Sequence, residues 1–254
     1  GSTDGIGLAV ALVWMMDTAG AQSRIRNAVT TGPVRTVTAS AGQLGALELA
    51  DGSRVRLAPE TNLLIPEKFG PDLRGVRIVG AARIVVAPGG SEPLTVIAGP
   101  ATIVATGPDF TVRAYPDEGG TVVALHEGQL TVRVGDASHA VAPGQGLFVP
   151  DSGAARAPTE GQMAEATSWT DNVYVASDRR IGSVIADLQR WYRTQIFATD
   201  PAILDRRVSI RASLDSVRQA IAAVEREGNV QFGYMNEKMV FTDRAPASAR
   251  KTAR

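Results

Sequence analysis

The chain has 254 residues, which is enough for one large domain or two modest ones. Lys and Arg together number 26, as do Asp and Glu, so no net charge attracts nucleic acid and we expect no nucleic-acid partner. The sequence has no cysteine and only two histidines, His126 and His139, which excludes disulfides, thiolate zinc sites and a His-rich metal cluster. We therefore expect neither a metal nor a cofactor.

Residues 1–30 differ in composition from the rest of the chain. Ile6–Met16 is an uncharged apolar run that Asp17 ends, shorter than the ~20 residues a complete spanning helix needs. A buried helix of a soluble domain is one alternative. We favour the outer half of a truncated membrane helix, because the next segment is β-rich and Trp14 suits an interfacial position. Ala19–Thr30, small and polar, is predicted to be a juxtamembrane linker, so residues 1–30 would anchor the chain to the inner membrane.

Residues 31–150 have the pattern of an all-β domain. Apolar and polar residues alternate with period two in short runs separated by Gly, Pro and Asp, which is typical of half-buried strands. Asp51-Gly52 lies between two such runs and predicts a tight turn, and Gly135-Asp136 predicts a later one. About a dozen short strands are expected, arranged as a sandwich or a twisted solenoid. Residues 151–168, rich in Ala, Gly and Pro, are predicted to be a linker.

Residues 169–243 predict a small α+β domain, and residues 244–254 a disordered tail. Strands are expected at Asn172–Val175 and Arg207–Ile210, and a final hairpin from Val230 to Phe241 turns at Asn236-Glu237. Two helices are expected between them. The apolar stripe of the first helix comprises Ile181, Val184, Ile185, Leu188 and Tyr192, and that of the second comprises Leu214, Val217, Ile221 and Val224.

The limits of these helices are predicted from capping residues. Ser177-Asp178 is expected to cap the first helix, and Asp200-Pro201 to end it. Ser213 is expected to cap the second helix, and Gly228 to close it.

Several segments of the β-region occur in an order that has a known counterpart. They are Leu49-Ala-Asp51-Gly52-Ser53-Arg54-Val55-Arg56-Leu57, Gly80-Ala81-Ala82, Phe110-Thr-Val112-Arg-Ala114-Tyr115, Leu125-His-Glu127-Gly128-Gln-Leu130-Thr-Val132 and Ala142-Pro143-Gly144-Gln145. In sequence and order they resemble the periplasmic domain of the FecR family, with Ala81 in place of the family's Glu. The resemblance implies structural roles for Asp51, Gly52, Gly80, Phe110, Val112, Glu127, Gly128, Pro143 and Gly144.

The C-terminal region adds a second resemblance. Leu188-Gln-Arg190-Trp191-Tyr192 is similar to a segment of the small STN-like domain that follows FecR domains. Together, the two resemblances imply the periplasmic, signal-receiving part of an anti-sigma regulator anchored in the inner membrane. Its implied partners are the N-terminal signalling domain of a TonB-dependent outer-membrane receptor, often one for iron uptake, and an ECF sigma factor bound by a cytoplasmic domain absent from this sequence.

Some members of the family cleave themselves at a Gly-Thr bond before the Phe-x-Val strand. That reaction needs the threonine hydroxyl to attack the preceding carbonyl carbon. The matching segment here is Thr106-Gly107-Pro108-Asp109-Phe110, in which Pro108 stands where threonine would be. Proline has no hydroxyl, so we expect no cleavage after Gly107.

The other residues that could carry chemistry have simpler interpretations. His126-Glu127 is expected to be a strand end before a turn, and Trp191-Tyr192 a packing element rather than a sugar platform. Arg54, Arg56, Arg74 and Arg77 are expected on a solvated sheet face, with a patch for an anionic partner as the alternative.

Three functions are compatible with the sequence. We expect a binding protein and not an enzyme. A module that binds peptidoglycan or another envelope polysaccharide is the alternative. A hydrolase would need converging carboxylates, for which Asp109, Asp117 and Glu127 are the candidates.

Overall fold

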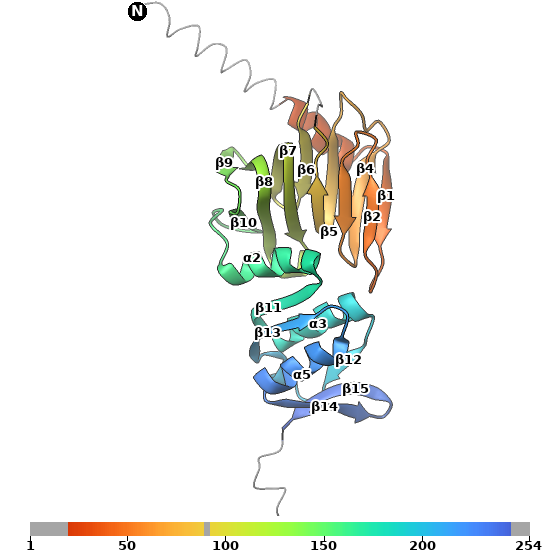
Figure 1. Ribbon diagram of the computed structural model, residues 1–254, viewed down its shortest axis with the longest axis vertical. Coiled ribbons are helices and arrows are strands. Elements are labelled where there is room, and N and C mark those ends of the chain that lie inside the picture. Colours follow the sequence, from red (N-terminus) through yellow and green to blue (C-terminus); the bar gives the residue numbers. More distant parts are fainter. Residues whose placement is uncertain (1–19, 89–91, 245–254) are drawn as a thin grey trace, which may run out of the picture. The chain divides into compact units, whose positions relative to one another are not determined.

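The structure is a computed structural model that describes residues 20–88 and 92–244 (Figure 1). The described residues form two compact units. The β unit takes those among 1–38, 45–57 and 61–156, and the α+β unit takes those among 39–44, 58–60 and from 157 onward. The predicted membrane helix lies outside the described residues, as does most of the predicted tail. Within the described ranges, no helix is both long and apolar enough to cross a membrane.

Residues 20–30 are helical, which corrects the prediction of a juxtamembrane linker. This helix packs on the β unit through Ile25 and Val29, which are 7% and 1% exposed. Ile25 lies so close to Gly75 that a Cβ at that position would stand 2.2 Å from its Cγ2 atom. The sequence did not reveal the helix because only two large apolar residues, four positions apart, mark its buried face.

The predicted all-β domain is confirmed. Its strands form one connected ten-stranded sheet with the order β1-β4-β5-β6-β7-β8-β10, to which β2, β3 and β9 are attached (Figure 1). The strands are β1 (Val34–Ala39), β2 (Gly45–Glu48), β3 (Arg54–Leu57), β4 (Thr61–Pro66), β5 (Gly75–Val85), β6 (Leu94–Ala98), β7 (Ala101–Ala114), β8 (Gly120–Val134), β9 (Ala137–Val141) and β10 (Gly146–Pro150). A short 3-10 helix, η1 (Pro116–Glu118), joins β7 to β8.

Three strands are longer than the predicted short runs: β5 has 11 residues, β7 has 14 and β8 has 15. All five residues of β6 are buried, as are the first six of β8. Because side chains of a strand alternate between faces, these segments are covered on both faces. The core is therefore built from consecutive apolar positions rather than from one alternating face.

The α+β unit contains the predicted strands and helices together with four further elements. Its elements are α2 (Glu160–Thr167), η2 (Ser168–Asp171), β11 (Val173–Arg180), α3 (Ile181–Tyr192), β12 (Ile196–Ala198), α4 (Pro201–Leu204), β13 (Arg207–Ser213), α5 (Val217–Glu227), β14 (Val230–Met235) and β15 (Lys238–Asp243). The four further elements are α2, η2, β12 and α4. Strands β11 and β13 pair antiparallel, and β12, β15 and β14 form a second sheet in that order. In the second sheet β12 is parallel to β15.

Helix α2 lies in the stretch predicted to be an irregular linker. Thr159 and Gln162 form a capping box, in which each side chain accepts a hydrogen bond from the other residue's backbone N–H. Glu165 then ties the helix to β11, because its carboxylate accepts from the Ser177 N–H at 2.7 Å and pairs with Arg179 at 3.1 Å. The helix has one buried residue, Ala166, so it presented no apolar stripe to predict from.

The apolar stripes of α3 and α5 are confirmed at Ile181, Val184, Ile185, Leu188, Ile221 and Val224, all at most 9% exposed. The predicted N-caps are wrong, whereas Gly228 is the C-cap of α5, as predicted. Ser177 and Asp178 belong to β11, and α3 begins after Arg180 without a side-chain cap. Ser213 belongs to β13, and Ser216 caps α5, so Leu214 precedes that helix.

Asp200-Pro201 does not end α3, which stops at Tyr192. Instead, Asp200 caps the short helix α4, in which Pro201 takes a first-turn position.

Candidate partner-docking surface

Asp51 and Gly52, singled out by the sequence, form the turn between β2 and β3. Gly52 has a φ of +83°, in the region where a side chain is strained. The Asp51 carboxylate accepts from the Ser53 N–H at 2.8 Å and the Ser53 hydroxyl at 2.9 Å, and from Arg74 Nε at 2.6 Å. The Asp51 carboxylate thus bonds to Ser53 of the same turn and to Arg74, which packs against it, so Asp51 supports the fold rather than presenting a ligand site.

Burial by itself raises the pKa of Asp51. The hydrogen bonds from Ser53 and the Arg74 guanidinium outweigh that effect and hold the pKa below its usual value. Arg74 is 5% exposed, which corrects its expected place on a solvated face. Its other nitrogens donate to the carbonyls of Glu92 and Ala87, at 2.8 and 3.1 Å.

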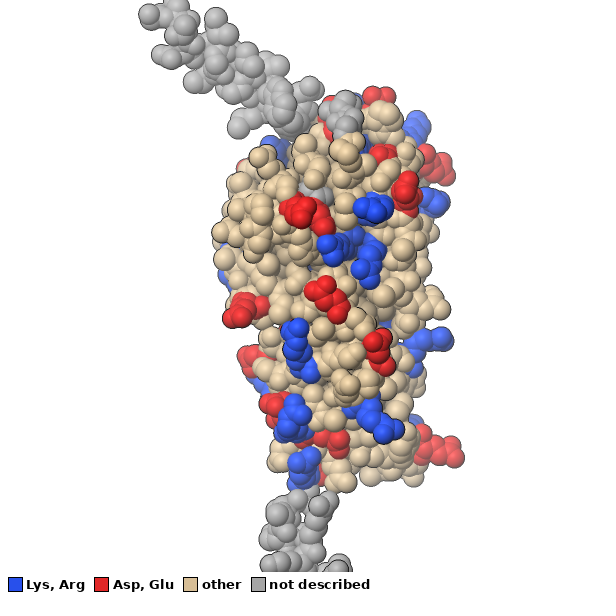
Figure 2. All heavy atoms as spheres, viewed as in Figure 1, with Lys and Arg blue, Asp and Glu red and all other residues tan. Residues whose placement is uncertain are grey.

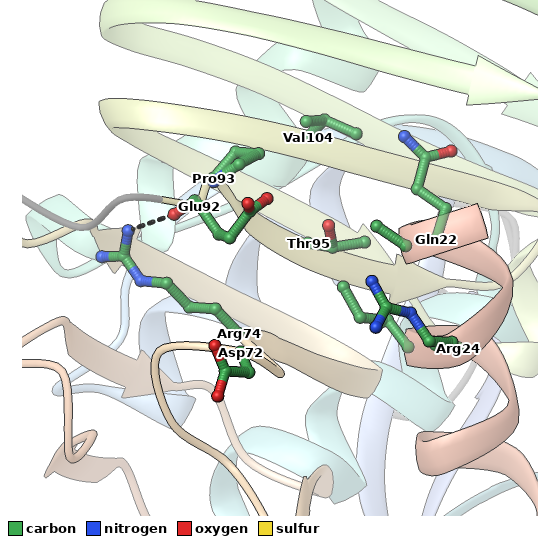
Figure 3. Close-up of a pocket in the computed structure, with 10 residues that line it drawn as sticks. Gln22, Arg24, Asp72, Arg74, Glu92, Pro93, Thr95 and Val104 are labelled. Atoms are coloured by element: carbon green, nitrogen blue, oxygen red, sulfur yellow. Dashed lines mark hydrogen bonds between the residues drawn. The ribbon is translucent and has the colours of Figure 1, made fainter. Parts of the chain in front are cut away.

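A cavity of about 380 Å³ lies beside Arg74, with the helix of residues 20–30 along one wall. Figure 3 shows the Arg74 guanidinium turned toward Glu92 and away from Arg24, which is carried by that helix. Since Arg74 already has a carboxylate and two carbonyl partners, it has little capacity left for a ligand in this cavity.

Gly80 lies at the point where β5 changes its neighbours. It has a φ of +121°, and a Cβ there would stand 2.4 Å from the Thr61 hydroxyl oxygen. That hydroxyl accepts from the Ala81 N–H at 2.9 Å, which fixes β4 against β5. Gly80 therefore permits a close approach of two backbones, a structural role.

The remaining motif residues also occupy structural positions. Phe110 and Val112 are fully buried in β7. Glu127 and Gly128 lie in β8, opposite an irregularity of β7 that contains Gly107. Gly107 has a φ of +65° and Gly128 a φ of +90°. Pro143 and Gly144 turn the chain between β9 and β10, and the Gly144 N–H donates to the Leu125 carbonyl at 2.8 Å.

The three carboxylates considered for catalysis are not all brought together, because Asp117 lies apart from the other two. Asp109 and Glu127 are cross-strand neighbours in β7 and β8. Asp109 is held by a bidentate pair with Arg83, at 2.9 and 2.7 Å. Asp117 lies in η1, beyond the end of β7, and the five strand steps from Asp109 to Ala114 span ~16 Å. In the described ranges, no group of three His, Cys, Asp or Glu residues is placed to hold a metal ion.

Trp191 and Tyr192 pack as expected. Trp191 is 8% exposed, and its ring centroid lies 6.3 Å from that of Trp169. The Tyr192 hydroxyl donates to the Ser213 carbonyl at 3.0 Å. Burial, together with the negative charge of Asp215, raises the pKa of Tyr192 to about 12.

The surface distribution of apolar side chains was not predicted from sequence. All large apolar side chains exposed in the described part of the chain belong to the α+β unit. They are Leu44 (54%), Phe197 (43%), Leu204 (37%), Tyr234 (74%) and Met235 (50%). Three of these five lie on the sheet β12-β15-β14, which makes that sheet the candidate docking surface.

The exposed residues of this sheet lie on both of its faces. Val230, Phe241 and Ile196 are buried on one face, and the register places Tyr234 at the end of that face, beyond the core. The register places Phe197 and Met235 on the opposite face, together with Val240 and Lys238. Lys238 Nζ lies 5.4 Å from the centroid of the Phe197 ring.

Strand β14 is an edge of the sheet, and its open side is partly blocked. The Phe232 N–H donates to the Glu225 carboxylate of α5 at 2.8 Å, so it points away from β15. Because amide directions alternate along a strand, the Tyr234 backbone faces the same open side. The Glu225 carboxylate occupies the Phe232 N–H and so limits unwanted strand pairing at that position. The backbone beside Tyr234 remains open to pairing with another strand.

Charges of both signs are interspersed on the face of the described residues in Figure 2, with no extended field of one sign. This agrees with the zero formal net charge. Apolar contact and backbone pairing are therefore the stronger contributions that this surface can offer to a partner.

Comparison with known proteins gives the relationship of the β unit. Residues 35–131 match the family described as FecR protein. The chain thus contains a FecR domain, as the sequence motifs indicated. A search of the curated proteins finds no match.

Two solved structures share the fold. They are crystal structures of a candidate anti-sigma factor from Parabacteroides distasonis, determined at 2.50 and 1.65 Å resolution. Each is 22% identical to this chain, with TM-scores of 0.72 and 0.71. The alignments cover 83% and 82% of this chain and 99% of the other. The similarity spans most of the chain and therefore extends beyond the residues of the FecR domain.

Proposed function

We propose that this chain is the signal-receiving portion of a FecR-like transmembrane regulator, located in the periplasm and anchored to the inner membrane. It works by binding and not by catalysis. The α+β unit is STN-like, and it receives the N-terminal signalling domain of a TonB-dependent outer-membrane receptor. A cytoplasmic domain outside this sequence then acts on an ECF sigma factor.

The observation that carries this proposal is the exposed apolar edge of β14 in a chain with a FecR domain. Tyr234 and Met235 are 74% and 50% exposed, although apolar side chains of this size are usually buried. An incoming strand can pair with the open side of β14 beside Tyr234, while both side chains supply apolar contacts. Aromatic residues of this kind contribute strongly to the binding energy of interfaces.

Binding transmits a signal only if the partner favours one state of the chain over another. The helix of residues 20–30 is suited to respond, because it follows the predicted membrane segment and is docked on the β unit rather than extended as a free linker. A change in its docking would alter how the chain continues toward the membrane.

The test is a titration of the full chain with the purified N-terminal signalling domain of its receptor. We expect the double variant Tyr234→Ser/Met235→Ser to weaken binding at least tenfold, which corresponds to about 1.4 kcal/mol. Leu204→Ser is the matched control, because Leu204 is exposed but lies on α4, off the sheet.

A second pair of variants tests backbone pairing. Tyr234→Pro removes an N–H that does not contribute to the pairing with β15, whereas Tyr234→Ser keeps it. If β14 pairs with the partner, the proline variant binds more weakly than the serine variant. Equal affinity of the two variants would exclude edge pairing. Retention of the chain on peptidoglycan, with no affinity for the receptor domain, would favour the envelope-binding alternative instead.

A further inference from the structure

Two arginines of the β unit meet where the helix of residues 20–30 crosses the sheet. Arg26, on the helix, donates from Nη2 to the Thr102 hydroxyl at 2.5 Å. Arg133, on β8, donates from Nη1 to Gln22 Oε1 of the helix at 2.8 Å. Thr102 and Arg133 are register partners in β7 and β8, so the two guanidinium groups are held over the same position of the sheet.

Both arginines bind neutral oxygen atoms. No ion pair joins either of them to a carboxylate within the described residues. Arg74 differs, because Asp51 neutralises it directly. Two permanent cations that line the same cavity, with no carboxylate of the described chain within ion-pair distance of either, repel each other, and an anion bound between them would relieve that repulsion.

The space for such an anion is present. A cavity of about 580 Å³ is lined by both arginines, and by Ser23 and Thr102, two residues that carry hydroxyl groups. Asp136 also lines the cavity, but it forms no ion pair with Arg26 or Arg133 among the described contacts. The cavity is larger than a single phosphate group needs, and it is open to solvent, so a group attached to a larger molecule can enter it.

We propose that this cavity binds a phosphate group between Arg26 and Arg133. The planar guanidinium fork matches the oxygen atoms of a phosphate, and each arginine keeps N–H groups beyond the one that binds Thr102 or Gln22. Because Arg26 is carried by the helix and Arg133 by the sheet, the bound phosphate fastens the helix to the β unit.

Phosphate is available as a free anion and as the headgroup of an anionic phospholipid. The position of the site in the sequence favours the lipid, because Ser23 and Arg26 follow the apolar run Ile6–Met16, the predicted membrane segment, by only 7 and 10 residues. Binding to free phosphate and to lipid vesicles, measured separately, distinguishes the two sources.

The full chain is titrated calorimetrically with inorganic phosphate at constant ionic strength, and separately floated with vesicles of phosphatidylglycerol or phosphatidylcholine. We expect saturable phosphate binding and greater recovery with phosphatidylglycerol. The double variant Arg26→Gln/Arg133→Gln weakens phosphate binding at least tenfold and abolishes the preference between vesicles. Arg26→Lys/Arg133→Lys, which keeps both charges but loses the forks, gives an intermediate loss.

The matched control is Arg54→Gln/Arg218→Gln. It removes the same charge from two arginines that do not line the cavity. Circular dichroism verifies that each variant is folded. If the glutamine variant does not fold, phosphate binding by the lysine variant supplies the second measurement. Saturable phosphate binding without a vesicle preference identifies a soluble anion as the ligand. The proposal is overturned if neither probe binds specifically, or if the control loses as much affinity as the cavity variant.

Discussion

The variant Asp51→Asn tests the role assigned to the turn between β2 and β3. It keeps the size of the side chain but removes the negative charge that faces Arg74 Nε at 2.6 Å. Arg74 is 5% exposed and Asp51 13% exposed, so the cation would be left largely buried without its counter-charge. Ser53 would also lose a carboxylate acceptor for its hydroxyl.

Removing one partner of a buried ion pair costs about 3–5 kcal/mol in the free energy of unfolding. We expect the lower end of that range, about 3 kcal/mol, because Arg74 keeps two carbonyl acceptors. The matched control is Asp109→Asn, which breaks the pair with Arg83. Arg83 is 31% exposed, and a pair screened by water to that degree contributes about 1 kcal/mol or less.

Urea unfolding followed by far-UV circular dichroism reports on both units, whereas fluorescence from Trp169 and Trp191 follows the α+β unit, so a transition seen only by circular dichroism belongs to the β unit. Hydrogen exchange gives a local measurement, because the Ala87 N–H donates to the Ser53 hydroxyl at 3.0 Å. We expect faster exchange of the Ala87 amide in Asp51→Asn. If this variant were no less stable than Asp109→Asn, with Ala87 protection unchanged, the structural assignment of Asp51 would be wrong.

The same residue sets a pH dependence. Its pKa is lower in the folded chain than the value near 4 of an unfolded aspartate, so its contribution to stability is fully present above that value. The contribution is lost as the pH falls below about 4 and through the folded pKa. The acid limb of a stability–pH profile should therefore be shallower for Asp51→Asn than for the unchanged protein, and identical limbs would contradict the assignment.

Four further outcomes are expected. Trp191→Phe should cost less stability than Trp169→Phe in urea unfolding, by about 1 kcal/mol, because Trp191 Nε1 is buried with no hydrogen-bond partner among the described residues, while Trp169 Nε1 donates to a carbonyl at 2.9 Å; a reversed order would refute this. The raised pKa of Tyr192 should make stability fall as the pH rises from about 10 through about 12, and Tyr192→Phe should remove that part of the alkaline loss measured by fluorescence. Gly80→Ala should destabilise the β unit by at least about 1 kcal/mol in thermal unfolding, since both the positive φ and the nearby threonine oppose a Cβ; an unchanged melting temperature would show that β4 can move away. On a denaturing gel the purified chain should stay intact at Gly107, and two fragments divided there would refute the prediction of no self-cleavage.

Local sequence signals were sufficient where one residue or one period determines the structure. Alternation predicted the β unit, and 3.6-residue stripes predicted α3 and α5. The final hairpin turns at Asn236-Glu237 as predicted, and both residues have positive φ values of 50° and 66°. Asparagine adopts such values readily, so the signal is local and strong.

Signals were insufficient where structure depends on a distant partner. Arg74 resembles Arg54 and Arg56 in its local sequence, but its carboxylate partner lies 23 positions away in sequence. Tyr234 lies on an exposed edge because β15 is the central strand of the sheet, with β14 on one side and the three-residue strand β12 on the other, which leaves the outer side of β14 open. For helix α2 a usable signal was present: the capping box of Thr159 and Gln162, rather than an apolar stripe.

The pairing of β5 has a consequence for how the chain is made. This strand bonds to β3, β4, β6 and β7, whereas β1 bonds only to β4, and β2 only to β3. When the chain emerges with its N-terminus first, β1 can pair with β4 and β2 with β3, but these two pairs are joined to each other only once residues 75–85 are made, and β5 itself waits for β7. The first four strands are therefore present during synthesis as two separate pairs with open edges. A chaperone that binds extended segments would be most useful to this protein before residue 114 has appeared.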